Sequence, residues 1–113
     1  MSTRLCIVEE WVLRYNFEWD PEKARQNLQK HKVAFEKAAE VFLDPLAISI
    51  FDQGHSHSID EERWVTIGRN KGGMILVVVH TFVIQGRDKR KIRIISTRKA
   101  TRNEIKQYES ETP

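Results

Sequence analysis

Cysteine is nearly absent from this sequence, which holds Cys6 alone among its 113 residues. A single cysteine excludes an internal disulfide framework and a zinc site built on several cysteines. Long apolar runs are missing too, because the longest, residues 74–79, is far shorter than the ~20 residues of a membrane span. Charged residues interrupt residues 1–15, which is not typical of a signal peptide. We therefore expect a cytoplasmic protein without membrane contact.

The motifs of common catalytic classes are also absent. The chain has no P-loop, no G-x-G-x-x-G and no G-x-S-x-G nucleophile elbow. One His-x-His pair, His55 and His57, has no supporting cysteine and is weak evidence for a metal site. We predict that the protein has no metal site and no cofactor.

Positive charge, by contrast, is concentrated in one segment. The net charge is only +3, yet residues 87–102 carry a dense run of lysine and arginine opposed only by Asp88. This asymmetry favours a polyanionic ligand or an acidic protein partner. A solvated charged surface explains the run about as well.

Two helix signals lie in the first half of the chain. An aspartate followed by proline at 20–21 predicts a helix over 21–31. A second apolar stripe predicts a helix over 35–43, which the Asp-Pro pair at 44–45 ends. In the first helix, the spacing predicts one buried face that holds Ala24, Leu28 and His31.

The second half of the chain has the two-residue period of strands. We expect strands over 47–52, 63–69, 74–82 and 91–96, with the apolar 74–82 at the centre of the sheet and a basic loop over 83–90. A turn holding Arg98 and Lys99 then leads into a helix over 101–108. Its start carries a T-x-x-E capping box, Thr101 and Glu104.

Helices followed by hairpins predict an α+β fold. Two N-terminal helices pack on one face of a mostly antiparallel sheet, with a short C-terminal helix, and the other face is left for a ligand. We assign residues 17–110 to this domain and residues 1–16 to an N-terminal extension, which is either an added strand or a loose arm.

Arginine is the side chain whose placement best suits a polyanion. Arg63 and Arg69 bracket one strand, Arg93 lies on the last strand and Arg98 follows it. The planar guanidinium binds phosphate through two hydrogen bonds and stabilises charge on its oxygens. Each arginine taken singly is explained as well by a surface or sheet-edge position.

Several blocks of the sequence, in register, resemble the BrnT family. They are FEWDPEKARQNLQKH at 17–31, FEKAAEVFLDP at 35–45 and IRIISTRKATRNEIKQYE at 92–109. BrnT proteins are type II toxins whose fold resembles that of the RelE ribonucleases. This sequence departs from the family pattern at Lys32 and Ala34, where a glycine and a serine are usual.

The resemblance implies a metal-independent endoribonuclease that cleaves mRNA, on or off the ribosome, and arrests translation. A ribose 2′-OH attacks the adjacent phosphate, leaving a cyclic phosphate and a 5′-OH. It also implies a cognate BrnA-like antitoxin of the ribbon-helix-helix type. This antitoxin neutralises the toxin and supplies the DNA-binding domain of the complex.

Residues and resemblance together give the candidate site. We expect the arginines to hold phosphate and His31 or His80 to transfer protons, with His80 facing the same groove. The catalytic candidates are His31, Arg63, His80, Arg93 and Arg98. The substrate-binding candidates are Lys30, Lys91, Lys99 and Tyr108.

Two other functions explain parts of the pattern. A non-catalytic basic module that docks an acidic protein or a nucleic acid accounts for the cationic segment and for the lack of an acid–base pair. A DNA-binding repressor is disfavoured, because no helix-turn-helix pattern is found.

Overall fold

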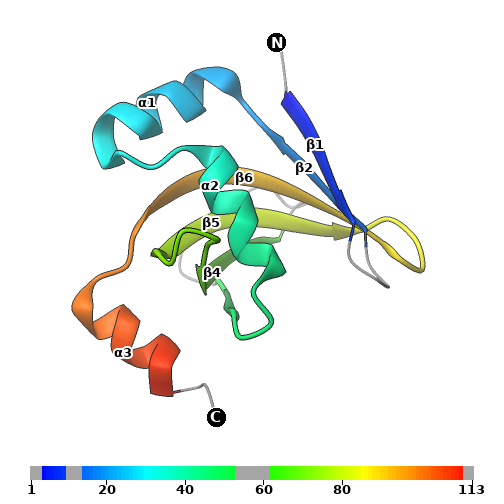
Figure 1. The fold of residues 1–113 in the computed structure, drawn as a ribbon. Helices are drawn as coiled ribbons and strands as arrows, with labels where there is room; N and C mark the ends of the chain where they lie inside the picture. Colours follow the sequence, from blue (N-terminus) through cyan, green and yellow to red (C-terminus); the bar gives the residue numbers. More distant parts are fainter. Residues whose placement is uncertain (1–3, 10–13, 53–61, 111–113) are drawn as a thin grey trace.

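The computed structural model describes residues 4–9, 14–52 and 62–110. Six strands form one sheet in the order β1-β2-β6-β5-β4-β3, in which β2 and β6 run parallel and all other neighbours are antiparallel. Figure 1 shows α2 crossing the central strands and α3 well away from α1. The elements are β1 Arg4–Glu9, β2 Arg14–Trp19, α1 Pro21–His31, α2 Phe35–Ala39, the 3-10 turn η1 Glu40–Leu43, β3 Ile48–Phe51, β4 Arg63–Arg69, β5 Ile75–Ile84, β6 Lys89–Lys99 and α3 Arg102–Ser110.

The α+β class is confirmed, and the sheet has more strands than predicted. The strand around Phe17 begins at Arg14 and forms a hairpin with β1, so the sheet extends into the predicted N-terminal extension. The division of the chain at residue 17 stays a prediction. Within the described residues, no helix is long and apolar enough to cross a membrane.

Helix α1 has the predicted bounds. Asp20 caps it by accepting a hydrogen bond from the Glu22 amide at 2.9 Å, and Pro21 occupies the first helical position. The helix ends at Lys32, whose φ of 62° is the left-handed conformation that favours glycine, so lysine there costs about 1 kcal/mol. The predicted buried face is wrong, because Leu28 is 48% exposed and Asn27 is buried instead.

Asn27 joins α1 to the edge of the sheet. Strand β2 pairs with β6 only as far as Arg93, so the rest of that edge of β6 has no neighbouring strand. The Asn27 side chain donates to the Thr97 carbonyl at 2.9 Å and accepts from the Thr97 amide at 3.1 Å. Its amide also donates to the Val33 carbonyl at 3.2 Å. One buried amide therefore pairs the edge of β6 as a strand would.

The main core lies between the sheet and the segment from α1 to η1. The face of the sheet that this segment covers is called the helix face. Helix α2 is shorter than predicted and continues as η1 before Asp44. Ala34, at the start of α2, provides no side-chain cap. The buried cluster contains Phe17, Trp19, Val33, Phe35, Ala38, Ala39, Val41, Leu76, Val78, Ile92 and Ile94.

The second half of the chain matches the predicted strand positions, with β5 and β6 longer and β3 shorter than predicted. Strand β4 has the predicted bounds, and β5 lies at the centre as expected. The predicted basic loop over 83–90 is wrong, because only residues 85–88 lie between β5 and β6. The predicted turn at Arg98 and Lys99 is also wrong, because both residues lie in β6 and pair with β5. Charged side chains are compatible with a strand that is exposed on one face.

The face of the sheet opposite the helix face is only partly open. Helix α3 packs Tyr108 onto it, against Ile67 and Val77. The expectation of a fully free second face is therefore wrong at the end near α3. None of the helices in the described part of the chain lies over the end near the β5–β6 turn. We call this uncovered end the open face.

We predict that Asn27→Ala lowers the free energy of unfolding by about 2–4 kcal/mol, because three buried backbone groups lose their partner. Urea denaturation measures the change. The matched control is Gln29→Ala on the exposed side of α1, which should stay within about 0.5 kcal/mol of wild type. Equal stabilities of the two variants would contradict this role of Asn27.

Candidate functional site

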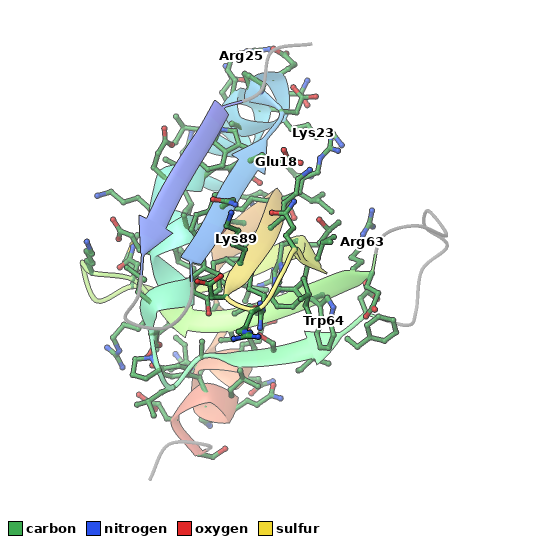
Figure 2. The ribbon with its side chains drawn as sticks, turned by 90° about the vertical axis from the view of Figure 1, so that its right-hand side faces the viewer. Glu18, Lys23, Arg25, Arg63, Trp64 and Lys89 are labelled. Atoms are coloured by element: carbon green, nitrogen blue, oxygen red, sulfur yellow. The ribbon has the colours of Figure 1, made fainter. Side chains whose placement is uncertain are left out.

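Four residues form a line across the open face, one on each of four neighbouring strands. Arg63 of β4 pairs with Thr81 of β5, and Thr81 pairs in turn with Arg93 of β6. On the other side of β6, Arg93 pairs with Glu18 of β2. Directly paired residues share a face, so the four side chains are neighbours. We call this line the polar row. At about 4.8 Å between strands, the two arginine Cα atoms are roughly 10 Å apart. Figure 2 looks onto this end of the sheet.

The cations of the polar row are mostly uncompensated. Among the described residues, neither Arg63 nor Arg93 has an ion-pair or hydrogen-bond partner for its side chain. Lys91, on the same face of β6, contacts Glu18 with its Nζ 3.3 Å from the carboxylate oxygen. Two free guanidinium groups on half-buried strands create a site that favours an anion lying between them.

Arg98 lies on the same side of the sheet but outside the polar row. The β5–β6 register shifts by one residue at Ile95, and this bulge brings Arg98 to the side of Arg93. Five residues of extended strand place the two Cα atoms roughly 16 Å apart. The structure therefore does not bring Arg98 together with Arg63 and Arg93.

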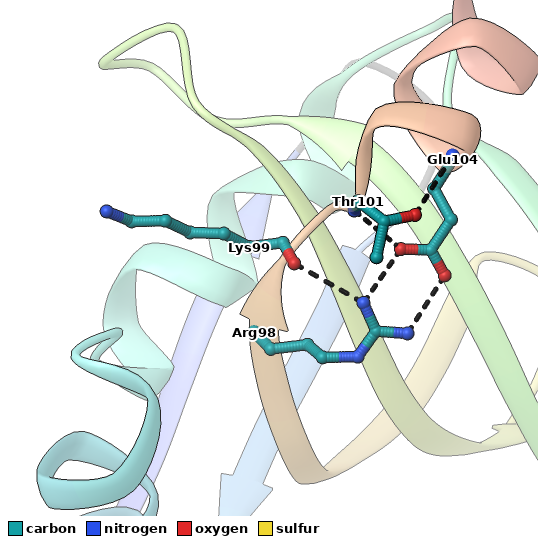
Figure 3. A network of polar contacts seen from close by, with 4 residues as sticks. All are labelled: Arg98, Lys99, Thr101 and Glu104. Carbon is teal, nitrogen blue, oxygen red and sulfur yellow. Dashed lines mark hydrogen bonds and ion pairs between the residues drawn. The ribbon is translucent and has the colours of Figure 1, made fainter.

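The guanidinium of Arg98 is already occupied. Its Nη1 and Nη2 donate to the two Glu104 oxygens at 2.7 and 2.9 Å, and Nη1 also donates to the Lys99 carbonyl (Figure 3). Glu104 in turn completes the predicted capping box with Thr101, which is confirmed. The hydrogen bonds from Arg98, with the Thr101 amide, lower the pKa of Glu104 to about 2. Arg98 thus anchors the start of α3.

Lys30 and His31 line a separate groove of about 300 Å³ between α1 and β6. The rest of its lining is Lys23, Gln26, Asn27, Ile95 and Ser96. Ile95 follows Arg93 by two residues, so the groove lies roughly 7 Å further along β6. Lys99 is exposed and pairs with Leu76, which faces the helices. Lys30 and His31 therefore adjoin the polar row, whereas Lys99 does not.

His80 lies on the opposite face, which contradicts the expectation that it faces the groove of the arginines. It pairs with Trp64 and its ring stands edge-on to Phe42 on the helix face. There it lines a mostly aromatic cavity of about 290 Å³. Within a central strand apolar on both sides, alternation alone does not indicate which way a histidine points.

The hydrogen bonds of His80 fix its tautomer. Nδ1 lies 3.0 Å from the Thr81 carbonyl, which only accepts, so Nδ1 carries the proton. Nε2 then accepts from the Thr66 hydroxyl at 2.6 Å, and Thr66 accepts from Ser49. Burial lowers the pKa of His80 to about 4. A neutral, fully bonded core histidine explains this geometry without a proton-transfer role.

Tyr108 is a core residue, and its predicted role in substrate stacking is wrong. It is 3% exposed, its hydroxyl donates to Asp44 at 2.6 Å, and the Arg69 guanidinium lies over its ring. Burial, followed by the bond to Asp44, raises the pKa of Tyr108. Its amphipathic helix buries the ring because the apolar cluster around Ile67 lies beneath it.

Two important residues were not identified from the sequence alone. Glu18 alternates with the buried Phe17 and Trp19, which does indicate an outward side chain, but its neighbours on β6 depend on a parallel pairing of distant segments. Asn27 lies on the buried side of α1, between Ala24 and His31. Its position there is the only feature of the sequence that could have indicated a buried polar contact. His55 and His57 lie outside the described residues, among which no three potential ligands gather for a metal.

Comparison with known proteins gives a family match over most of the chain. The family described as "Ribonuclease toxin, BrnT, of type II toxin-antitoxin system" matches residues 19–104. None of the curated proteins matches the sequence. Among solved structures, the chain is similar to the ribonuclease toxin BrnT of Brucella abortus, with 25% identity, 74% of this chain and 94% of that chain covered, and a TM-score of 0.48.

We predict that protonation of His80 destabilises the protein in mild acid. Its pKa is about 4 when folded, against 6.5 for an ordinary histidine, so the folded state binds fewer protons between these values and stability falls as the pH drops. From pH 7 to pH 5 this group alone should remove about 2 kcal/mol. Urea denaturation at several pH values measures the free energy of unfolding, and between pH 7 and pH 5 His80→Gln should lose about 2 kcal/mol less of it than wild type. An equal loss in the two proteins would contradict the assignment.

We predict that Arg98 and Glu104 stabilise α3 as one unit. Arg98→Ala and Glu104→Gln should each lower the free energy of unfolding by about 1 kcal/mol, a modest value because both groups are partly exposed to solvent. The double variant should lose little more than either single variant. Thermal denaturation of all four proteins completes the cycle, and strictly additive losses would show that the pair is not coupled.

Proposed function

The chain belongs to the BrnT family of ribonuclease toxins of type II toxin-antitoxin systems, and we propose that it is a metal-independent endoribonuclease that cleaves mRNA and thereby arrests translation. The observation that carries this proposal is the polar row. It holds two arginines whose Cα atoms are roughly 10 Å apart and whose side chains have no partner among the described residues, on the part of the sheet that none of the described helices covers. Arg63 and Arg93 both fall within the residues that match the family.

The proposed reaction is an attack of the ribose 2′-OH on the adjacent phosphorus. The oxygen–phosphorus bond that forms closes a 2′,3′-cyclic phosphate, and the bond to the 5′-oxygen breaks to release a 5′-OH end. Negative charge builds on the non-bridging oxygens as the phosphorus becomes five-coordinate. Arg63 and Arg93, from opposite sides of Thr81, donate to those oxygens and stabilise that charge. This chemistry uses no metal and no cofactor.

The surfaces beside the polar row have supporting roles in this proposal. Lys30 and His31 bind the RNA strand along the groove of α1. Arg98 acts on the RNA through long-range charge, because its own hydrogen bonds go to Glu104. The arrangement of helices and sheet corresponds in this proposal to a RelE-like fold in the cytoplasm.

The proposed partner is a cognate BrnA-like antitoxin with a ribbon-helix-helix DNA-binding domain. An acidic segment of that antitoxin lying on Arg63 and Arg93 would neutralise the charge and block RNA with the same contacts. The toxin chain then meets DNA only within the complex.

A non-catalytic basic binding module is the second candidate. One observation favours it: His80, predicted to transfer protons, faces away from the arginines. A module of this kind would bind RNA with a steep salt dependence and leave it intact. Cleavage by the purified protein therefore separates the two functions.

We predict that Arg63→Ala and Arg93→Ala each lower the rate of RNA cleavage by roughly 100-fold or more, because each removes a donor to the transition-state oxygens. The assay follows a short RNA in excess EDTA and identifies cyclic-phosphate and 5′-OH ends. The matched control is Lys37→Ala, which removes one positive charge from the exposed side of α2.

In the control the rate should remain within about twofold of wild type, because the charge lies on the far side of the molecule. Activity that disappears in EDTA would contradict metal independence. Unchanged cleavage by both arginine variants would remove the polar row from the site.

A further inference from the structure

Glu18 of the polar row is in contact with Lys91, which lies two residues before Arg93 on β6, so a carboxylate and an ammonium group meet at this end of the row. We propose that Glu18 and Lys91 are the general base and general acid of the reaction. This inference rests on the proposed function, since it assigns the two protons that RNA cleavage by the 2′-OH must move. The residues that match the family begin at position 19, directly after Glu18.

The position of Glu18 follows from the alternation of β2. Phe17 and Trp19 are 0% and 3% exposed in the main core, so Glu18 between them points to the opposite face. Parallel pairing sets Glu18 beside Arg93, the inner arginine of the polar row. A phosphate held between Arg63 and Arg93 therefore has a carboxylate at one end of the row.

Lys91 belongs to the same face because it lies two residues before Arg93 on β6. Its Nζ is 3.3 Å from a Glu18 oxygen, and the side chains are 40% and 21% exposed. This exposure leaves both groups accessible to a substrate. A carboxylate can accept a proton and an ammonium group can donate one.

The proton balance of the step closes within the pair. Glu18 accepts the proton of the 2′-OH as the 2′-oxygen bonds to phosphorus. Lys91 donates a proton to the 5′-oxygen as the phosphorus–oxygen bond breaks. The products are the cyclic phosphate, the 5′-OH, a neutral Glu18 and a neutral Lys91. Transfer of the proton from Glu18 to Lys91 across their contact then restores both charged groups for the next turnover.

The charges around the pair are consistent with these roles. From β6, Lys91 and Arg93 face Glu18, and across the sheet Arg63 is the next cation. The partner of Glu18 on β1 is Leu5, which does not titrate. From α1, Lys23 lines the adjoining groove. Among the described residues of these strands the other carboxylate is Glu9, which pairs with Arg14 at the far end of the β1–β2 hairpin, so Glu18 is the acid beside Arg93.

The base is tested by the pH dependence of kcat on a chimeric RNA with one 2′-OH. In wild type, kcat should rise with pH over the acidic part of the profile, where the base loses its proton; we call this rise the acid limb. Glu18→Gln should lose the acid limb and roughly 100-fold in kcat. Glu18→Asp, which keeps a carboxylate, should retain the limb at a reduced rate. His31→Gln should keep it as well. A limb that persists in Glu18→Gln and disappears in His31→Gln would overturn the proposal.

The acid is tested with a substrate whose leaving 5′-oxygen is replaced by sulfur. A thiolate leaves without a proton, so the loss in Lys91→Ala, roughly 100-fold on ordinary RNA, should shrink to within about tenfold on the sulfur substrate. Arg93→Ala should stay impaired on both. Lys89→Ala, a cation two residues earlier on the same face of β6, is the matched control and should cleave both substrates nearly as wild type does.

These outcomes separate the pair from the function itself. If folded wild-type protein cleaves no RNA, the proposed function fails. If wild type cleaves and Lys91→Ala is equally impaired on both substrates, Lys91 only binds phosphate and the proposal is overturned while the function stands. Circular dichroism of each variant confirms that the comparison is made on folded protein.

Discussion

The pairing of Asn27 with Thr97 is the contact on which the arrangement of the candidate site depends. Strand β6 is longer than its parallel neighbour β2, and a bare sheet edge inside a protein would leave peptide groups without partners. A single buried amide supplies both a donor and an acceptor to that edge. As a result β6 has β2 beside its first half and α1 beside its second half. Glu18 and the groove of Lys30 and His31 are thereby set along one strand.

The structure also separates cations that hold the fold from cations that are free to bind. Arg98 and Arg93 lie on one side of one strand. A bulge at Ile95 and a bidentate contact with Glu104 give Arg98 a structural partner, while Arg93 has none among the described residues. A compensated, partly exposed charge contributes modestly to stability, whereas an uncompensated charge on an open face contributes to recognition of an anion.

Much of the fold could be predicted from the sequence because it follows from local signals. The bounds of α1, the strand over 63–69 and the capping box at Thr101 each depend on a few adjacent residues. The candidate site was only partly predictable. The strand pattern placed Arg63 and Arg93 on two strands, but the face of His80 depends on hairpin register in a strand buried on both sides. Glu18 depends on a parallel pairing between opposite ends of the chain, which no local pattern encodes.

The most direct test of the account is to locate the phosphate on the protein. A dinucleotide with a 2′-O-methyl group lacks the attacking hydroxyl and stays intact, so its binding can be followed by chemical-shift changes in the isotope-labelled protein. We predict that the largest changes fall on Arg63, Thr81 and Arg93. Changes confined to α3 and Arg98, or to the cavity around His80, would contradict it.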